Sequence, residues 1–311
     1  MAESGWLPGP QLRVTINGTV ETILTTPDGV SLWTETFGEP GQPALLLVMG
    51  AMNQGIFWPD AFCQQLADAG HFVIRYDHRD TGRSSKVGRW PPYTLKALAR
   101  DALAVLQGLG VARATVVGLS MGGFIGQWLA VQHPERVERL VLISTSADHR
   151  PYVVATLGLP ARLLRLPPPE PGYLAYLQRL KRLPPKTPEA VFASVSEGWA
   201  TTYAGPRPYP RAEVEAAIRL AYTRTHEPLA ALNHGLAVAV SRHRLELVKR
   251  IRVPTLVIHG RHDPLFPLPH GAYLAQHIPD ARLVVLDMGH AFMWSWDAEV
   301  RDAILGFVRG G

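Results

Sequence analysis

Cysteine is nearly absent from this chain of 311 residues, in which Cys63 is the only one. A single cysteine cannot form a disulfide within the chain or supply a multi-cysteine zinc site, so disulfide-framed secreted domains and zinc modules are excluded. Cys63 falls in a predicted helix whose apolar face includes Phe62 and Leu66. We therefore interpret it as a small buried side chain and not as a thiol nucleophile.

Long hydrophobic runs are also missing. The longest apolar stretches, such as Ala44–Met49, are far shorter than the roughly 20 residues that a helix needs to cross a bilayer. The first five residues, Met1–Gly5, show no basic head, apolar segment or cleavage-like site of a secretory signal. These absences lead us to expect a cytoplasmic protein without a membrane partner.

Clustered charge is the third feature that the chain lacks. The formal net charge is +5, but the 31 lysines and arginines are scattered and never form a run of five or six. A nucleic-acid partner is therefore not expected. Hydrophobic residues make up 47% of the chain and charged residues 18%, which is typical of a folded protein with a sizeable core.

Strand and helix patterns alternate along most of the chain. After a loose leader over residues 1–20, Glu21–Thr25 and Ser31–Phe37, separated by the turn Asp28-Gly29, predict an antiparallel pair. Continuous apolar runs then predict buried parallel strands, and helical spacing predicts the helices between them. We expect strands at Ala44–Met49, Phe72–Tyr76, Ala114–Val117 and Val137–Ser144, with helices at Trp58–Ala69, Leu95–Leu109 and Met121–His133.

Prolines interrupt this rhythm between residues 146 and 225, where short helical pieces such as Tyr173–Leu183 and Arg211–Tyr222 are predicted. We call residues 146–225 the cap segment and expect a mainly helical insertion into a core made of residues 21–145 and 226–311. The strand and helix pattern resumes after the cap segment. There we expect helices at Leu229–Ile251, His270–His277 and Glu299–Val308, and strands at Thr255–His259 and Arg282–Leu286.

The stretch from Gly118 to Gly122 joins a predicted strand to a predicted helix and matches G-x-S-x-G, with Ser120 at its centre. Glycines beside the serine let the two elements approach on a sharp turn, which lifts the hydroxyl above the sheet and aims the first helical N–H groups at it. A dinucleotide-binding turn would need G-x-G-x-x-G, but Ser120 stands here at the position of the middle glycine. We therefore predict Ser120 as a nucleophile.

A serine hydroxyl needs a base, and the base needs a carboxylate that fixes its tautomer. Of the 12 histidines, His290 follows a predicted strand, which places it at the carboxyl edge of the sheet, where catalytic groups of open α/β sheets gather. Asp263 follows the preceding strand and is the predicted carboxylate. Asp148, just past an earlier strand, is the alternative acid.

Acyl transfer also needs two N–H donors for the oxyanion. We predict the backbone N–H groups of Met121, next to the nucleophile, and of Ala51, in a loop where Gly50 permits a tight turn. Part of the nearby apolar residues should line a mostly apolar pocket for the substrate. The predicted substrate-binding residues are Gly50, Met52, Phe124, Phe292 and Trp294.

A metal site is a further possibility that the histidines raise. His78, His259 and His262, with nearby aspartates, match no familiar metal-binding spacing, and Asp263 already has a place beside the base. We therefore expect no metal and no cofactor.

Several blocks of the chain together carry a family resemblance. Leu45–Gly50, Val73–Ser84 and Val117–Gly122, continued by Val253–Ile258, His262-Asp263-Pro264 and Met288-Gly289-His290, resemble the α/β-hydrolase superfamily, and within it esterases similar to aclacinomycin methylesterase. The resemblance implies an α/β-hydrolase fold, a mostly parallel central sheet flanked by helices with an inserted helical cap. It also implies the chain order nucleophile Ser120, acid Asp263 and base His290, with oxyanion donors at Ala51 and Met121.

This chain departs from the family pattern in two places. Met49-Gly50 stands where many members have His-Gly, and the cap segment does not obviously match the methylesterase. We predict a serine carboxylesterase that cleaves small to medium esters through an acyl-enzyme. Lactone opening, C–C bond hydrolysis and perhydrolysis use the same triad and stay open, since a fold does not fix its substrate. The rival from another class is a non-catalytic module that binds a small molecule.

Overall fold

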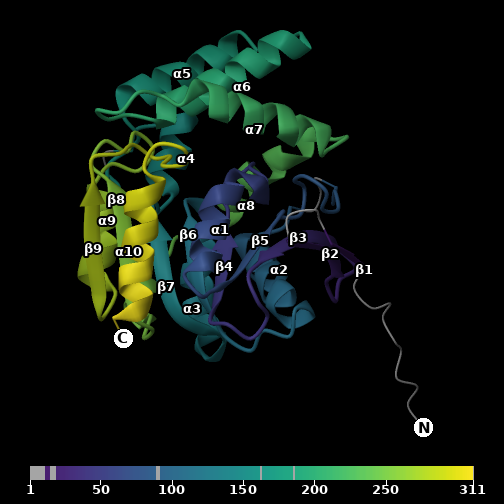
Figure 1. The fold of residues 1–311 in the computed structure, drawn as a ribbon. Coiled ribbons are helices and arrows are strands. Elements are labelled where there is room, and N and C mark those ends of the chain that lie inside the picture. The colour runs from purple at the N-terminus through teal and green to yellow at the C-terminus, as the bar shows by residue number, and fades with distance from the viewer. Residues whose placement is uncertain (1–10, 15–18, 89–91, 162, 185, 311) are drawn as a thin grey trace.

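A mixed sheet organises the fold (Figure 1). The computed structural model describes residues 11–14, 19–88, 92–161, 163–184 and 186–310, so most of the predicted leader lies outside the described residues. The strands are β1 (Gln11–Val14), β2 (Val20–Thr25), β3 (Ser31–Phe37), β4 (Ala44–Val48), β5 (Phe72–Tyr76), β6 (Ala114–Leu119), β7 (Val137–Ile143), β8 (Thr255–Gly260) and β9 (Ala281–Leu286).

The order of the strands across the sheet is β1-β2-β3-β5-β4-β6-β7-β8-β9. The strands β1, β2 and β3 pair antiparallel, and β3 is antiparallel to β5, whereas every pair from β5 across to β9 is parallel. The hairpin between β2 and β3 turns at Gly29, whose φ of 81° lies in the left-handed region that glycine adopts without a steric cost. The predicted fold class, a mostly parallel sheet with an antiparallel start, is confirmed.

Helices cover both faces of this sheet. Those in the described part of the chain are α1 (Asp60–Asp68), α2 (Leu95–Gly108), α3 (Met121–Gln132), α4 (Arg150–Thr156), α5 (Pro171–Arg182), α6 (Pro188–Thr202), α7 (Arg211–Thr223), α8 (Asn233–Val240), α9 (Pro269–His277) and α10 (Asp297–Arg309). The helices α2, α3 and α9 contribute buried residues to one face, and α1 and α10 to the other. None of the helices in these ranges is both long and apolar enough to span a bilayer.

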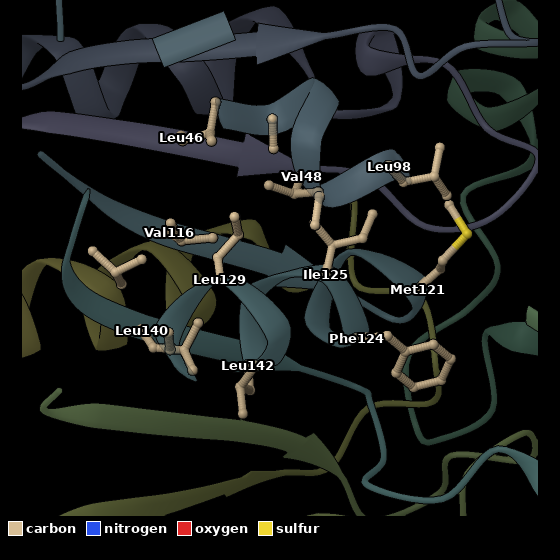
Figure 2. Close-up of a cluster of buried hydrophobic side chains, with 14 of the residues drawn as sticks. Leu46, Val48, Leu98, Val116, Met121, Phe124, Ile125, Leu129, Leu140 and Leu142 are labelled. Carbon is tan, nitrogen blue, oxygen red and sulfur yellow. The ribbon is translucent and has the colours of Figure 1, made fainter. Parts of the chain in front are cut away.

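Alternating strand residues supply the two buried cores. On β4, Leu46 and Val48 belong to the cluster that α2, α3 and α9 cover, whereas Leu45 and Leu47 belong to the cluster beneath α1 and α10. Figure 2 shows Val48 beside the α3 side chain Ile125, with Leu46 further along the same strand. Because both faces are buried, the parallel strands read in the sequence as continuous apolar runs.

The long helix predicted for Leu229–Ile251 is wrong. The structure instead has a 3₁₀ turn η3 (Pro228–Leu232), the helix α8 and a second turn η4 (Val248–Arg250). Between α8 and η4 the chain turns inward at Arg244, whose N–H donates to the Ala147 carbonyl at 2.7 Å and whose Nε donates to Gln127 Oε1 at 3.0 Å. In a continuous helix the Arg244 N–H would donate to the Val240 carbonyl, so its contact with Ala147 shows that tertiary contacts override local periodicity here.

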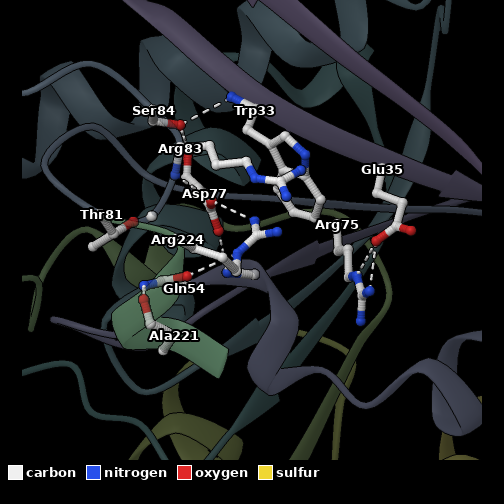
Figure 3. Close-up of polar contacts among 12 residues, drawn as sticks. Trp33, Glu35, Gln54, Arg75, Asp77, Thr81, Arg83, Ser84, Ala221 and Arg224 are labelled. Carbon is white, nitrogen blue, oxygen red and sulfur yellow. Dashed lines mark hydrogen bonds and ion pairs between the residues drawn. The ribbon is translucent and has the colours of Figure 1, made fainter. Parts of the chain in front are cut away.

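The cap segment contains α4 to α7, and in Figure 1 its helices α5, α6 and α7 lie together above one edge of the sheet. Arg224, at the end of α7, ties this part to the core (Figure 3). Its Nη2 lies 2.8 Å from Asp77 Oδ2, its Nε donates to Gln54 Oε1 at 2.9 Å, and its guanidinium lies 4.0 Å from the Trp33 ring centroid. Gln54 in turn donates to the Ala221 carbonyl at 2.7 Å. The ion pair is almost fully buried, so losing one partner would leave an uncompensated charge inside.

Candidate active site

Ser120 occupies the sharp turn between β6 and α3. Its φ of 54° and ψ of −114° are strained values for a residue with a side chain. A Cβ on Gly118 would lie 2.4 Å from the Gly122 carbonyl oxygen, and one on Gly122 would lie 2.0 Å from the Val48 carbonyl oxygen. Both glycines of the motif are therefore required by the close approach of α3 to the sheet, which is the arrangement that the sequence predicts.

His290 and Asp263 are in direct contact. His290 Nδ1 lies 2.9 Å from Asp263 Oδ2 and 3.1 Å from Oδ1, so Nδ1 carries the proton and Nε2 is left with its lone pair. Asp263 Oδ1 also accepts from the N–H groups of Leu265 and Phe266 at 2.9 Å. Burial alone would raise the pKa of Asp263, but its contacts with His290, with His259 and with the Phe266 N–H outweigh burial and hold that pKa below its usual value.

The alternative acid, Asp148, has a different partner. Its carboxylate accepts from Arg150 Nε at 2.8 Å and from Arg150 Nη2 at 2.6 Å. Burial opposes its ionisation, yet the hydrogen bonds from Arg150 keep the pKa of Asp148 below its usual value. The structure thus brings Asp263, and not Asp148, to His290.

Ser120 and His290 follow different parallel strands, and one aromatic ring links α3, which begins after Ser120, to His290. The Phe266 ring centroid lies 5.8 Å from the His290 ring and 5.8 Å from the ring of Phe124, which is one turn of α3 beyond Ser120. Among the described residues no hydrogen bond joins the Ser120 hydroxyl to His290. Catalytic hydrogen bonds of this kind often tighten only when substrate is bound.

The two predicted oxyanion donors belong to segments that meet at Ser120. Met121 directly follows Ser120 as the first residue of α3, and Ala51 directly follows Gly50, where a Cβ would lie 3.4 Å from Ser120 Cβ. Within the described ranges neither the Met121 nor the Ala51 N–H donates to a protein acceptor. Backbone N–H groups at a helix N-terminus favour a bound negative charge.

The other predicted substrate-binding residues lie in different surroundings. Met52 is 48% exposed beside Ala51, whereas Phe124 is buried between Phe266 and the guanidinium of Arg244. Trp294 is partly buried, with its ring edge-on to Phe57. Phe292 is fully buried against Trp58 and Phe62, so its contacts are with the core.

His259, for which the sequence offered no role, lies behind Asp263. Its Nε2 is 2.7 Å from the Phe266 carbonyl oxygen and 3.7 Å from Asp263 Oδ2. Burial lowers the pKa of this histidine, so it is a neutral donor next to the carboxylate. The one sequence signal for it is its place near the end of β8. In the described part of the chain, no three His, Cys, Asp or Glu side chains are grouped in a way that could hold a metal ion.

The loop that carries His290 is held by the end of α6, a contact that sequence reasoning missed. The Thr202 carbonyl accepts from the His290 N–H at 2.8 Å and from the Ala291 N–H at 3.3 Å. A Cβ on Gly289 would lie 2.2 Å from the Thr202 oxygen, so only glycine allows this approach. Tyr203 adds a hydrogen bond from its hydroxyl to the Met293 carbonyl at 2.8 Å. The cap segment therefore touches the backbone of the predicted base directly.

Almost the whole chain is similar to known hydrolases. Rhodomycin D methylesterase DnrP of Streptomyces peucetius is 38% identical over 296 residues, covering 93% of this chain and 98% of that protein. The 3-oxoadipate enol-lactonase 2 of Acinetobacter baylyi is 31% identical, covering 85% and 88%. Among solved structures, a hydrolase from Pseudomonas aeruginosa PA01 has a TM-score of 0.70 and 30% identity, covering 93% and 98%. The family model of the alpha/beta hydrolase fold matches residues 43–295, and the chain belongs to this family.

Proposed function

We propose that this protein is a carboxylic ester hydrolase in which Ser120 is the nucleophile, His290 the base and Asp263 the carboxylate that orients the base. The observation that supports these roles most is the contact of His290 Nδ1 with both oxygens of the buried Asp263, at the edge where the strained Ser120 turn lies. This contact leaves Nε2 of His290 free to accept a proton. The similarity to a methylesterase over most of both chains supports ester bonds as the target.

The reaction has two halves. Ser120 Oγ attacks the ester carbonyl while His290 Nε2 takes its proton, and the negative charge that forms on the carbonyl oxygen is held by the N–H groups of Ala51 and Met121. His290 then gives the proton to the departing alcohol, which leaves an acyl group on Ser120. Water, deprotonated by His290, attacks this acyl-enzyme, and collapse of the second oxyanion returns the proton to Ser120 and releases the acid.

We propose small-molecule esters with short to medium acyl groups as substrates, bound beneath the cap segment. Two contacts hold the cap segment against the core: Arg224 joins the end of α7 to Asp77, and the Thr202 carbonyl at the end of α6 accepts from the His290 loop. A cap segment that is held at both places cannot move away from the core easily, and long-chain lipids would need such a movement to enter. Lactone opening is the second candidate, because the chain is also similar to an enol-lactonase and a lactone is a cyclic ester.

The decisive experiment is reaction with a fluorophosphonate probe. We expect one probe per chain, attached to Ser120, and no labelling of Ser120→Ala, while the thermal stability of that variant stays near that of the wild type. Hydrolysis rates over aryl esters of increasing acyl length, with lactones alongside, then separate the two candidate substrate classes. If the wild-type protein takes up no probe and hydrolyses none of these compounds, the proposed function is wrong and a binding role replaces it.

A further inference from the structure

Two buried histidines hold the loop that carries Ala51. This loop follows β4. His78 Nε2 lies 3.0 Å from the Met49 carbonyl oxygen at one end of the loop, and at the other end the Met52 N–H donates to His234 Nδ1 at 2.9 Å. Both histidine side chains are fully buried. Neither has a place in the proton transfers described above.

The hydrogen bonds determine the protonation of both rings. A carbonyl oxygen only accepts, so His78 Nε2 carries a proton, and so does His234 Nε2, which lies 2.9 Å from the Arg79 carbonyl oxygen. His234 Nδ1 is thereby left as the acceptor for Met52. Burial lowers the pKa of His78 to about 3 and that of His234 to about 4, so both are neutral at neutral pH.

These contacts orient the peptide planes on either side of the Gly50–Ala51 peptide. The Met49 carbonyl sets the plane before it. The Met52 N–H, together with the Ala51 carbonyl that accepts from Asn53 Nδ2 at 3.0 Å, sets the plane after it. Because each peptide unit is planar, holding one polar group orients the whole unit. The Gly50–Ala51 peptide unit, which carries the Ala51 N–H, lies between these two held planes. It can rotate only as far as the backbone dihedrals of Gly50 and Ala51 allow.

Met52 needs this support more than its neighbours do. Its φ of 66° lies in the left-handed region, which is unfavourable for a residue with a Cβ. Its side chain does not compensate by packing, because the residue is 48% exposed. The bond to His234 is therefore the contact that holds the Met52 N–H in this conformation.

We propose that His78 and His234 are positioning residues of the oxyanion hole, which hold the Ala51 N–H at the place where the substrate oxyanion forms. This inference rests on the ester hydrolysis proposed above. His78 comes from the end of β5, next to β4 in the sheet, and His234 comes from α8, the helix that follows the cap segment. The helix α8, through which the chain returns from the cap segment to the core, thus supports the site through His234.

The two nitrogens of His234 can be tested separately. In His234→Asn the amide oxygen stands near the place of Nδ1 and can still accept from Met52, whereas in His234→Gln the longer amide reaches toward the Arg79 carbonyl and leaves Met52 without its acceptor. We expect kcat to fall about 10- to 100-fold in the glutamine variant, less than the 10²–10³-fold typical of removing an oxyanion donor outright. The asparagine variant should keep most of its turnover, with KM within about threefold of wild type in both.

The readout that isolates the oxyanion hole is inhibition by an aryl trifluoromethyl ketone, whose adduct with Ser120 carries an oxyanion. Its Ki should rise in His234→Gln by the factor by which kcat/KM falls. His71→Gln is the matched control, because that buried histidine contacts the Pro43 carbonyl at the opposite end of β5 and should leave Ki unchanged. For His78, replacement by Gln retains a donor for the Met49 carbonyl and replacement by Leu does not, so the leucine variant should show the larger loss.

Two results would overturn the proposal. In the first, the asparagine and glutamine variants of His234 keep wild-type kcat and Ki. In the second, both variants lose the same activity in step with the same loss of thermal stability, which would make His234 a merely structural residue. The proposed function fails in a different way, since the wild-type protein itself would then hydrolyse no ester.

Discussion

Replacing Gly122 by alanine tests the close approach on which the Ser120 turn depends. A Cβ at residue 122 would lie 2.0 Å from the Val48 carbonyl oxygen and 2.9 Å from that of Met49. Both are backbone atoms at the end of β4, so they cannot rotate away as the end of a flexible side chain would. Restoring an ordinary non-bonded separation requires α3 to move by more than about 1 Å away from the sheet.

The expected loss follows from that displacement. Overpacking a well-packed interior costs about 1–3 kcal/mol, and an unyielding backbone contact belongs at the upper end. The gain of alanine over glycine in a helix offsets about 0.5–1 kcal/mol of this. We expect a net loss of about 2 kcal/mol in the free energy of unfolding, which lowers Tm by roughly 3 °C, because the unfolding entropy of a chain of this size is about 0.65 kcal/mol/K. Because Met121 moves with the helix, kcat should also fall about 10²-fold.

Gly306→Ala is the matched control. Gly306 lies in α10, and a Cβ there would meet nothing within 4 Å, so the same chemical change should raise stability by about 0.5–1 kcal/mol and leave turnover unchanged. Thermal unfolding by circular dichroism and initial rates with p-nitrophenyl butyrate measure both effects. The reasoning is refuted if the two variants shift Tm alike, or if Gly122→Ala keeps the wild-type rate.

Three further predictions concern other ionisable groups. Asp263→Asn should lower kcat by about 10⁴, because an amide does not hold His290 in the required tautomer, whereas Asp148→Asn should keep near-wild-type initial rates; the reverse result would identify Asp148 as the acid. Burial raises the pKa of Asp297 to about 6, so between about pH 4 and pH 6 the folded protein keeps a proton that the unfolded chain has lost, and stability falls as pH rises through that window. The difference in urea midpoint between wild type and Asp297→Asn isolates this effect, and a difference that does not change with pH would contradict it. Burial raises the pKa of the Cys63 thiol to about 12, so thiol reagents should label the protein only after unfolding, and rapid labelling of the folded enzyme at pH 8 would speak against that burial.

Several features of the site followed from local patterns. The G-x-S-x-G spacing predicted a sharp turn, because glycines on both sides of a serine leave space for a strand and a helix to approach closely. The structure has both approaches, of Gly118 to the Gly122 carbonyl and of Gly122 to the Val48 carbonyl. Asp263 and His290 each follow an apolar run that forms a parallel strand, and parallel strands place their carboxyl ends at one edge. Their contact could therefore be expected without knowing any distance.

Other features depended on contacts between distant parts of the chain. Thr202, at the end of α6, supports the His290 loop through its carbonyl oxygen, a group that every residue carries and that no motif marks. The interruption after α8 arises because Arg244 turns inward to Gln127, a partner 117 positions away. Side-chain periodicity reports which face of an element is buried, and it says nothing about such a partner.

Local patterns in the sequence were enough to predict the fold class, the sharp turn at Ser120 and the chain order Ser120, Asp263, His290, because periodicity and short-range sterics act over a few residues. Distinguishing Asp263 from Asp148 needed the contacts of the folded chain, since both residues follow a strand at the same edge and only Asp263 contacts His290, whereas Asp148 contacts Arg150. The contact that holds the loop carrying Ala51 could not be read from the sequence either, because His234 lies 182 positions from Met52 and reaches it only where the chain has returned from the cap segment. Such contacts form between surfaces that folding brings together, so no local pattern encodes them.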